Sequence, residues 1–326
     1  ALVDRAGTRT PFVVGLFVEG VATLGYVVAV TAPFPEFWFL VARVCWGIGS
    51  ALVFATAYTI TADVSESASR GTSMGVVRAG ITFGFPAGLV LGGVVSELYS
   101  VAVAFVLAAG FALFASVLAY RIVPETHGEA VEAASGSVKP WEIDRSLPAV
   151  TVGLVNFGVF FAYVGALFST LVVFLEFRGI GLFGFDAQGT SGALMAVTVL
   201  AGSISMLAGG KLSDLYGYRV PIVLGSLLIS GVGFLLLPRP DGVAGIVAAC
   251  VLIGAGQGGT TGPMMALIAD LTPDERMGRA MGTNNVLGDV GGALGPLVSL
   301  PLVESVGFAP VYVACALIPV AAGVVL

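Results

Sequence analysis

The chain has 326 residues, of which 57% are hydrophobic and only 10% are charged, and its mean hydropathy is +1.01. Soluble domains carry about a quarter charged residues, so a soluble fold of this length could not bury so much apolar surface, whereas a lipid bilayer can hold it. The net charge of −6 comes with no basic face, which argues against a nucleic-acid partner.

Ten apolar segments are long enough to cross the hydrocarbon core of a bilayer, which takes about 20 helical residues. Turns that contain Pro, Gly or charged residues separate most of them. In chain order the segments cover residues 11–32, 37–62, 72–95, 101–123, 147–175, 189–209, 220–238, 243–269, 279–303 and 308–326. The longest polar stretch, 124–146, is interpreted as a linker between an N-terminal bundle, 1–123, and a C-terminal bundle, 147–326.

The basic residues define an orientation across the membrane. With the N-terminus in the cytoplasm, ten Arg and Lys side chains lie on the cytoplasmic side, and only Arg178 and Arg239 lie outside. We therefore expect a multi-pass protein of the plasma membrane whose linker is cytoplasmic.

An internal repeat indicates that the two bundles are related. The pattern G-x8-G-x3-G at 75–88 recurs 207 residues later at 282–295, and Ala62-Asp63 matches Ala269-Asp270 at the same offset. Parallel repeats about an axis along the membrane normal are an architecture of transporters.

Two charged turns carry a family resemblance. Residues 4–9 read Asp-Arg-Ala-Gly-Thr-Arg before the first span, and residues 210–219 read Gly-Lys-Leu-Ser-Asp-Leu-Tyr-Gly-Tyr-Arg at the matching place in the second bundle. Both resemble the loop signature G-x3-D-[RK]-x-G-x-[RK]-[RK] of the major facilitator superfamily of secondary transporters. The second copy has Leu215 where a base is usual. The first copy lacks its leading glycine, so the resemblance implies a chain that starts inside the motif and lacks the first two helices.

The resemblance implies an all-α membrane protein of two helical bundles, with about ten of twelve transmembrane helices present. Residues 1–123 would hold helices three to six, and 147–326 would hold helices seven to twelve. The charged turns would form a cytoplasmic gate of Asp4, Arg5, Gly7, Arg9, Gly210, Asp214, Gly217 and Arg219. Gly7 and Gly217 permit tight turns, and the bases can pair with acids on the next cytoplasmic loops, such as Glu66, Asp274 and Glu275.

The second span carries Arg43, followed by small residues at 47, 49 and 51. This arrangement resembles a motif of the family's fourth helix that is associated with proton-coupled members. An Arg within a span is costly unless it is paired or hydrated, and small residues allow another helix to approach. Alternatively, Arg43 extends to the outer interface, because it follows Glu36 by only seven residues.

The third span resembles the antiporter motif of the family's fifth helix, although Leu89 replaces the usual proline, which the second copy keeps as Pro296. Glycines at this spacing line one helix face and would allow backbone contact between the two bundles, with ordinary small-residue packing as the alternative. The expected interface glycines are Gly84, Gly88, Gly92, Gly291 and Gly295.

Polar residues inside the spans are candidates for transport. An acid in a bilayer tends to be protonated or partnered, so Asp289 and Glu19 join Arg43 as proton-coupling candidates, with Asp289 preferred because it lies mid-span among glycines. The candidates for a substrate cavity are Asn156, Phe160, Gln257 and Asn285. Each of these side chains could instead serve helix packing or a helix–helix hydrogen bond.

Other chemistries find no support in the sequence. The three cysteines, Cys45, Cys250 and Cys315, lie in apolar runs without CxxC spacing, and the one histidine, His127, lies in the polar linker, so we expect neither a metal nor a cofactor. A G-x-G-x-x-G pattern at 254–259 lies in a membrane-length apolar run and therefore does not indicate a dinucleotide site. With no Walker loop or nucleophile elbow, we expect neither an ATP-driven pump nor an enzyme.

These features favour a secondary transporter, expected to be a monomer, that moves a small molecule by alternating access, with proton-coupled efflux preferred. An uptake symporter or facilitator of the same fold is one alternative. A non-transporting membrane receptor or inactive remnant is the other.

The orientation predicts which loops an impermeant thiol reagent can reach. Single cysteines introduced as Ser135→Cys in the linker and Gly184→Cys between the fifth and sixth spans should be labelled from opposite sides of the membrane. Labelling of both from the same side would overturn the number of spans.

Overall fold

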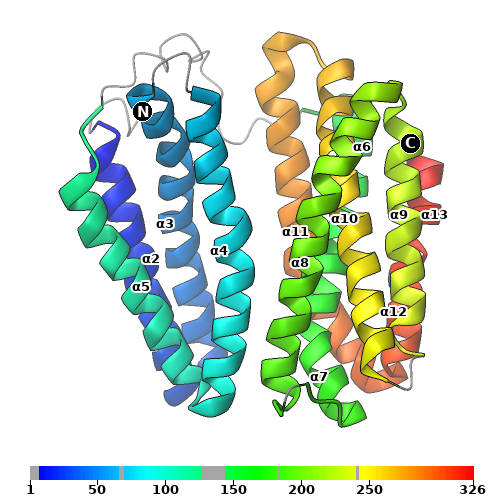
Figure 1. The fold of residues 1–326 in the computed structure, drawn as a ribbon, viewed down its shortest axis with the longest axis horizontal. Coiled ribbons are helices and arrows are strands. Elements are labelled where there is room, and N and C mark those ends of the chain that lie inside the picture. Colours follow the sequence, from blue (N-terminus) through cyan, green and yellow to red (C-terminus); the bar gives the residue numbers. More distant parts are fainter. Residues whose placement is uncertain (1–6, 66–69, 127–143, 183, 240–241) are drawn as a thin grey trace. The chain divides into compact units, whose positions relative to one another are not determined.

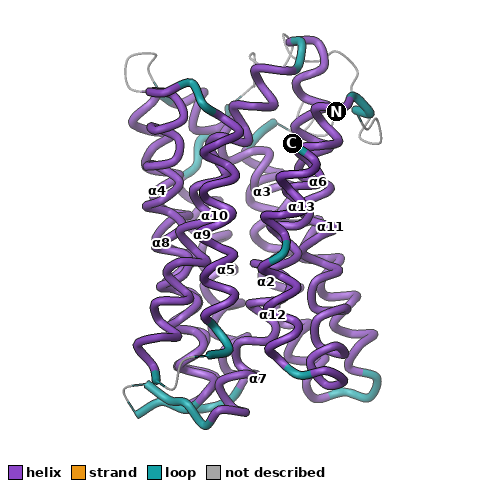
Figure 2. Tube along the Cα trace, turned by 90° about the vertical axis from the view of Figure 1, so that its right-hand side faces the viewer, coloured by secondary structure: helices purple, strands orange, loops and turns teal. Residues whose placement is uncertain are grey.

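The computed structural model describes residues 7–65, 70–126, 144–182, 184–239 and 242–326. Within these ranges the chain is helical, and the only extended pairing is an isolated bridge between Leu182 and Phe185 (Figures 1 and 2). Ten helices in the described part are long and apolar enough to span a membrane, which confirms the expected number of spans. Helices suit this environment because they satisfy their own backbone hydrogen bonds where no water is present. The chain divides into two compact units, residues 1–137 and 138–326.

The first unit contains the helices α2 (Arg9–Thr31), α3 (Pro35–Val64), α4 (Arg70–Leu98) and α5 (Val101–Ile122) (Figure 1). Helix α2 packs against both α3 and α5. The two backbones of α2 and α3 come close where Gly15 meets Gly49, because a Cβ atom on either residue would lie 2.8 Å from the carbonyl oxygen of the other. Small residues of this kind let two backbones approach inside a bilayer.

The second unit begins with one membrane-length helix, Leu147–Arg178, that contains a π-helical segment. Its parts are α6 (Leu147–Phe160), η2 (Phe161–Leu167) and α7 (Phe168–Arg178). The sequence predicted a regular span here, and the π-helical turns are a difference that hydropathy does not report. The helices that follow are α8 (Ala187–Tyr216), α9 (Arg219–Leu236), α10 (Val243–Leu271), α11 (Asp274–Val306), α12 (Phe308–Ala316) and α13 (Ile318–Val325).

Glycines decide how closely α8, α9 and α10 approach one another. A Cβ atom on Gly258 of α10 would collide with the carbonyl group of Gly202 of α8, and one on Gly256 would collide with the backbone of α9 at Ser226. The glycines of the G-x-G-x-x-G pattern at 254–259 are therefore the residues at which α10 packs closely against α8 and α9.

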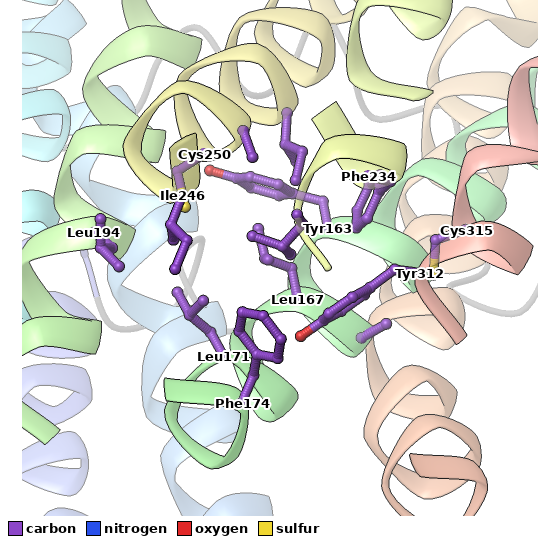
Figure 3. Close-up of a cluster of buried hydrophobic side chains, with 14 of the residues drawn as sticks. Tyr163, Leu167, Leu171, Phe174, Leu194, Phe234, Ile246, Cys250, Tyr312 and Cys315 are labelled. Carbon is purple, nitrogen blue, oxygen red and sulfur yellow. The ribbon is translucent and has the colours of Figure 1, made fainter. Parts of the chain in front are cut away.

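A buried apolar cluster lies in the second unit between η2, α7, α8, α9, α10 and α12 (Figure 3). Its largest fully buried side chain is Tyr312, whose hydroxyl group lies 2.9 Å from that of Thr170, so the polar end of the ring has a partner. Cys250 and Cys315 are free thiols buried in the same cluster, which is the packing role expected from the sequence, whereas Cys45 of α3 is exposed.

Candidate functional site

The charged loop of the second unit joins three helix ends through one side chain, Arg219. Gly217 ends α8 with φ at +68°, a left-handed conformation that strains any residue with a Cβ atom. The turn places Arg219 Nε 3.1 Å from the carboxylate of Asp270 on α10 and Nη1 2.6 Å from that of Asp214 on α8. Nη1 also donates to the Ser213 hydroxyl at 2.8 Å.

Asp270 is a partner of Arg219 that the sequence analysis did not name. Asp270 lies in the last turn of α10, before the loop that holds Asp274 and Glu275, whose side chains fall outside the described residues. The feature of the sequence that could have pointed to Asp270 is the repeat match between Ala62-Asp63 and Ala269-Asp270. Near Gly210 the glycine that allows the close approach is Gly262 of α10, because a Cβ atom on Gly262 would lie 3.2 Å from the Cα atom of Gly210, whereas a Cβ atom on Gly210 would have open space around it.

The matching loop of the first unit precedes a helix whose first N–H groups are capped by a distant acid. Asp4, Arg5 and Glu66 lie outside the described residues, but Gly7 and Arg9 are described. Glu125, which follows α5, accepts hydrogen bonds through Oε1 from the backbone N–H groups of Thr8 at 2.8 Å and Arg9 at 3.2 Å. These are among the first donors of α2, which no helical carbonyl can satisfy, and the helix dipole favours an acid there. Gly7, with φ at +72°, leaves the room, because a Cβ atom on it would collide with the Glu125 carboxylate.

Arg9 occupies a different environment from Arg219. Its guanidinium group donates to the carbonyl oxygen of Tyr120 and lies 4.8 Å from the centre of that ring, a cation–π contact. The Nε atom of Arg9 is buried without a hydrogen-bond partner, and so is Oδ2 of Asp63, the repeat equivalent of Asp270. The arginine of the charged loop is thus held by carboxylates in the second unit, as Arg219, and by the end of α5 in the first unit, as Arg9.

Asp144 fixes the start of the second unit. Its backbone N–H donates to the Thr283 hydroxyl of α11 at 2.9 Å, and its carboxylate accepts from the backbone N–H of Ser146 at 2.8 Å. The bond from Ser146, with the positive charges of Arg276 and Arg279, lowers the pKa of Asp144 below its usual value of 3.8. The carboxylate is therefore charged at neutral pH and holds the beginning of α6, while the backbone N–H group of Asp144 ties this segment to α11.

The charged candidates in the spans of the first unit lie on or against α3. Arg43 is exposed, and its guanidinium group stacks 4.7 Å from the ring centre of Trp46; it forms no ion pair with another described residue. Glu19 is half-buried, and its carboxyl group faces the side chain of Ser50. Gly49 makes the approach possible, because a Cβ atom there would lie 3.0 Å from the Glu19 side chain, whereas Gly47 has no neighbour within 4 Å.

The polar candidates of α11 and α6 separate into two groups. Asp289 and Asn285 are exposed one turn apart on α11, and no hydrogen bond joins either side chain to another described residue. Asn156 of α6 is buried instead, and its amide Nδ2 donates to the backbone carbonyl oxygen of Asn284 at 2.9 Å. Phe160 lies beside it, with its ring 3.6 Å from where a Cβ atom on Gly288 would be.

Gln257 faces the interior of the second unit. It lines a space of about 10 Å³ together with Tyr163 and Ser230, which is enough for one water molecule. Within the second unit, Asn156 and Phe160 therefore lie against α11, whereas Gln257 lines a separate small space. Asn284 is fully buried within its span. It is not among the cavity candidates taken from the sequence, which include its neighbour Asn285.

Two of the expected interface glycines have close neighbours within their own unit. Gly291 and Gly295 were expected to allow contact between the bundles, but they pack against the first helix of their own unit. A Cβ atom on Gly291 would collide with the carbonyl group of Phe157, and one on Gly295 would collide with Gly165 of η2. The spacing of small residues shows that a helix is approached closely, but it does not show which helix approaches. A Cβ atom added to Gly84, Gly88 or Gly92 of α4 would have no neighbouring atom within 4 Å among the described residues.

Comparisons with known proteins agree with this architecture. A sequence model of the family described as Major Facilitator Superfamily matches residues 1–296 and 184–326. An uncharacterized MFS-type transporter of Methanocaldococcus jannaschii is 24% identical over 99% of this chain and 82% of its own length. The multi-drug resistance efflux pump PmrA of Streptococcus pneumoniae is 22% identical over 86% of this chain and 69% of the pump. The crystal structure of a bacterial homologue of the human lysosomal transporter Spinster, inward-facing and occupied, superposes with a TM-score of 0.76 at 15% identity, covering 99% of this chain and 82% of that one.

The lowered pKa of Asp144 predicts a pH-dependent contribution to stability. A carboxyl group whose pKa is depressed in the folded state stabilises it above the unfolded pKa, and this stabilisation is lost as the pH falls through the folded value. At pH 7, Asp144→Asn should therefore lower the Tm of the purified protein by about 2–4 °C, as expected for about 1 kcal/mol. Below pH 3.8 the difference from wild type should shrink.

Thermal unfolding between pH 3 and pH 7 measures this difference. Glu304→Gln, which changes an exposed acid of the same unit, is the matched control and should leave the Tm unchanged at both ends of the range. An Asp144→Asn variant as stable as wild type at pH 7 would contradict the assignment.

Proposed function

Because the chain belongs to the Major Facilitator Superfamily, we propose that it is a proton-driven secondary transporter that exports a small molecule from the cell by alternating access. Members of this family are membrane transporters and not enzymes, and the same holds for this chain. Efflux is supported by the likeness to a multidrug efflux pump over 86% of the chain. We further propose that it works as a monomer in the plasma membrane with its linker in the cytoplasm.

The proton-coupled part of the proposal rests on the environment of Asp289. It is the only charged residue between Arg279 and Glu304, and it is exposed on α11 without a hydrogen-bond partner among the described residues. An acid within a span is tolerated when it is protonated, paired or hydrated. A carboxyl group with no fixed partner can exchange its proton as access to water alternates. Glu19 is the second candidate, but it already has Ser50 as a partner.

Replacement of Asp289 by Asn tests coupling, because it keeps the volume of the side chain and removes the titration. Wild-type protein in proteoliposomes with a proton gradient should transport an amphipathic cationic dye such as ethidium in the efflux direction. Asp289→Asn should lose at least tenfold of the proton-driven transport while dye counterflow persists, and Glu304→Gln should behave as wild type. Unchanged proton-driven transport in Asp289→Asn would make the acid structural and direct attention to Glu19. Movement of every tested compound only inward would favour the uptake alternative, and no transport of any compound would favour a receptor.

We also propose that the charged loops act as the cytoplasmic gate. In the second unit, Arg219 holds the ends of α8, α9 and α10 together through Asp214 and Asp270. The side chains of these two acids are 74% and 54% exposed, so the ion pairs contribute no more than about 1 kcal/mol to stability. A cluster that contributes little to stability but fixes the position of a loop is suited to a role in motion.

The gate predicts a transport defect without a stability defect. Asp270→Asn should change the Tm by less than about 3 °C, in line with an exposed pair, and should lower the transport rate at least fivefold. Asp270→Glu keeps the charge and should restore most of the rate. The gating role is wrong if Asp270→Asn transports at the wild-type rate in the same proteoliposome assay.

A further inference from the structure

Asn284 is a polar side chain buried without any partner. Its exposed fraction is 0%, and neither the oxygen nor the nitrogen of its amide has a hydrogen bond to any residue that the structure describes. A side-chain amide turned by 180° would be unpaired as well, because neither atom has a partner within reach among those residues. The residue lies ten positions into α11, about 15 Å along the helix axis and inside the span. Leaving such groups unpaired costs free energy, so another state of the protein should use them.

A second amide lies next to this side chain. Asn156 of α6 is 7% exposed, and its Nδ2 atom donates to the backbone carbonyl oxygen of Asn284 at 2.9 Å. Gly288 makes this position possible, because a Cβ atom there would lie 2.5 Å from the same Nδ2 atom. Two asparagines from neighbouring helices therefore meet, but the bond between them runs to the backbone and leaves the Asn284 side chain unused.

The contact between the two helices is built to slide. Gly291 rests on the carbonyl group of Phe157 in α6, and Gly295 meets Gly165 of η2 backbone to backbone, so no large side chain interlocks the helices at these two points, although Leu287 packs on Gly153 nearer the start of α6. The π-helical turns of η2 adjoin this contact and offer a second hydrogen-bonding pattern close to the α-helical one. Shifts of about 1–2 Å between packed helices are a common form of conformational switching.

We propose that Asn156 and Asn284 form a two-position hydrogen-bond latch between α6 and α11. In the described state Asn156 binds the backbone carbonyl group of Asn284, and in another state of the transport cycle it binds the Asn284 side-chain amide. Asn284 is then a positioning residue that raises the free energy of one state and lowers that of the other, so that both stay populated. The latch rests on the proposed transport function and adds the element that moves within the second unit.

Leucine substitutions separate this role from simple packing. Asn284→Leu removes two unpaired polar atoms, so its Tm should equal or exceed that of wild type, while ethidium transport should fall about tenfold. Asn156→Leu removes a hydrogen bond that exists in the described state, so its Tm should fall together with transport. Transport by the double variant should be no lower than by the worse single variant, because the two amides act as one unit. Ser299→Ala, which removes a buried hydroxyl from the same helix, is the matched control and should transport as wild type.

A second measurement does not depend on transport. A trifluoromethyl probe on Leu154→Cys, at an exposed position of α6, in a Cys45→Ala background, should give two exchanging fluorine NMR resonances in the otherwise wild-type protein. Asn284→Leu should leave mainly one of them. If Asn284→Leu does not fold, the smaller Asn284→Ala takes its place in both experiments.

Three results would overturn the latch. Wild-type transport in Asn284→Leu would make the amide a structural defect without function. A Tm lowered as far as in Asn156→Leu would show that the amide has a partner in the described state, such as an internal water. Identical fluorine spectra of the wild-type and Asn284→Leu proteins would show that no second position exists. Failure of the wild-type protein to transport any compound, with two resonances still present, would reject the proposed function and leave the latch standing.

Discussion

Helices inside a bilayer gain little by hiding apolar side chains from lipid tails that are equally apolar, so they assemble only as far as their backbones can approach. In this chain glycine sets that distance. Gly15 and Gly49 bring α2 to α3, Gly202 and Gly258 bring α8 to α10, and Gly165 and Gly295 bring η2 to α11. Each pair replaces interlocking side chains by contact along the backbone, which holds the helices close and still allows them to shift along each other.

The same environment makes the few polar groups informative. Where a polar side chain serves structure alone, its partner is present, as in the pair of Thr170 and Tyr312. Asn284 is buried in a helix contact with neither amide atom paired among the described residues, and it is there that we infer motion. An unsatisfied polar group within a span is costly enough that structure alone does not explain its presence.

The number and placement of the spans could be predicted because the length of an apolar run is a local property of the sequence. The turns at Gly7 and Gly217 could be predicted for the same reason, since a left-handed residue favours glycine. The partners of the charged residues could not. Glu125 caps a helix that starts 116 residues earlier, and only the fold brings the two together. The π-helical turns of η2 leave hydropathy unchanged, and the glycine spacing of α11 does not say that α6 and η2 are the neighbours.

The capping of α2 by Glu125 also has a consequence for synthesis. The first N–H groups of α2 emerge from the ribosome 117 residues before the carboxylate that satisfies the first of them. At about 5–20 residues per second, this interval lasts roughly 6–23 seconds. During that time α2 must keep its leading end in contact with water or the insertion machinery. The oldest helix of the first unit is therefore completed only after the youngest one, α5, has been made.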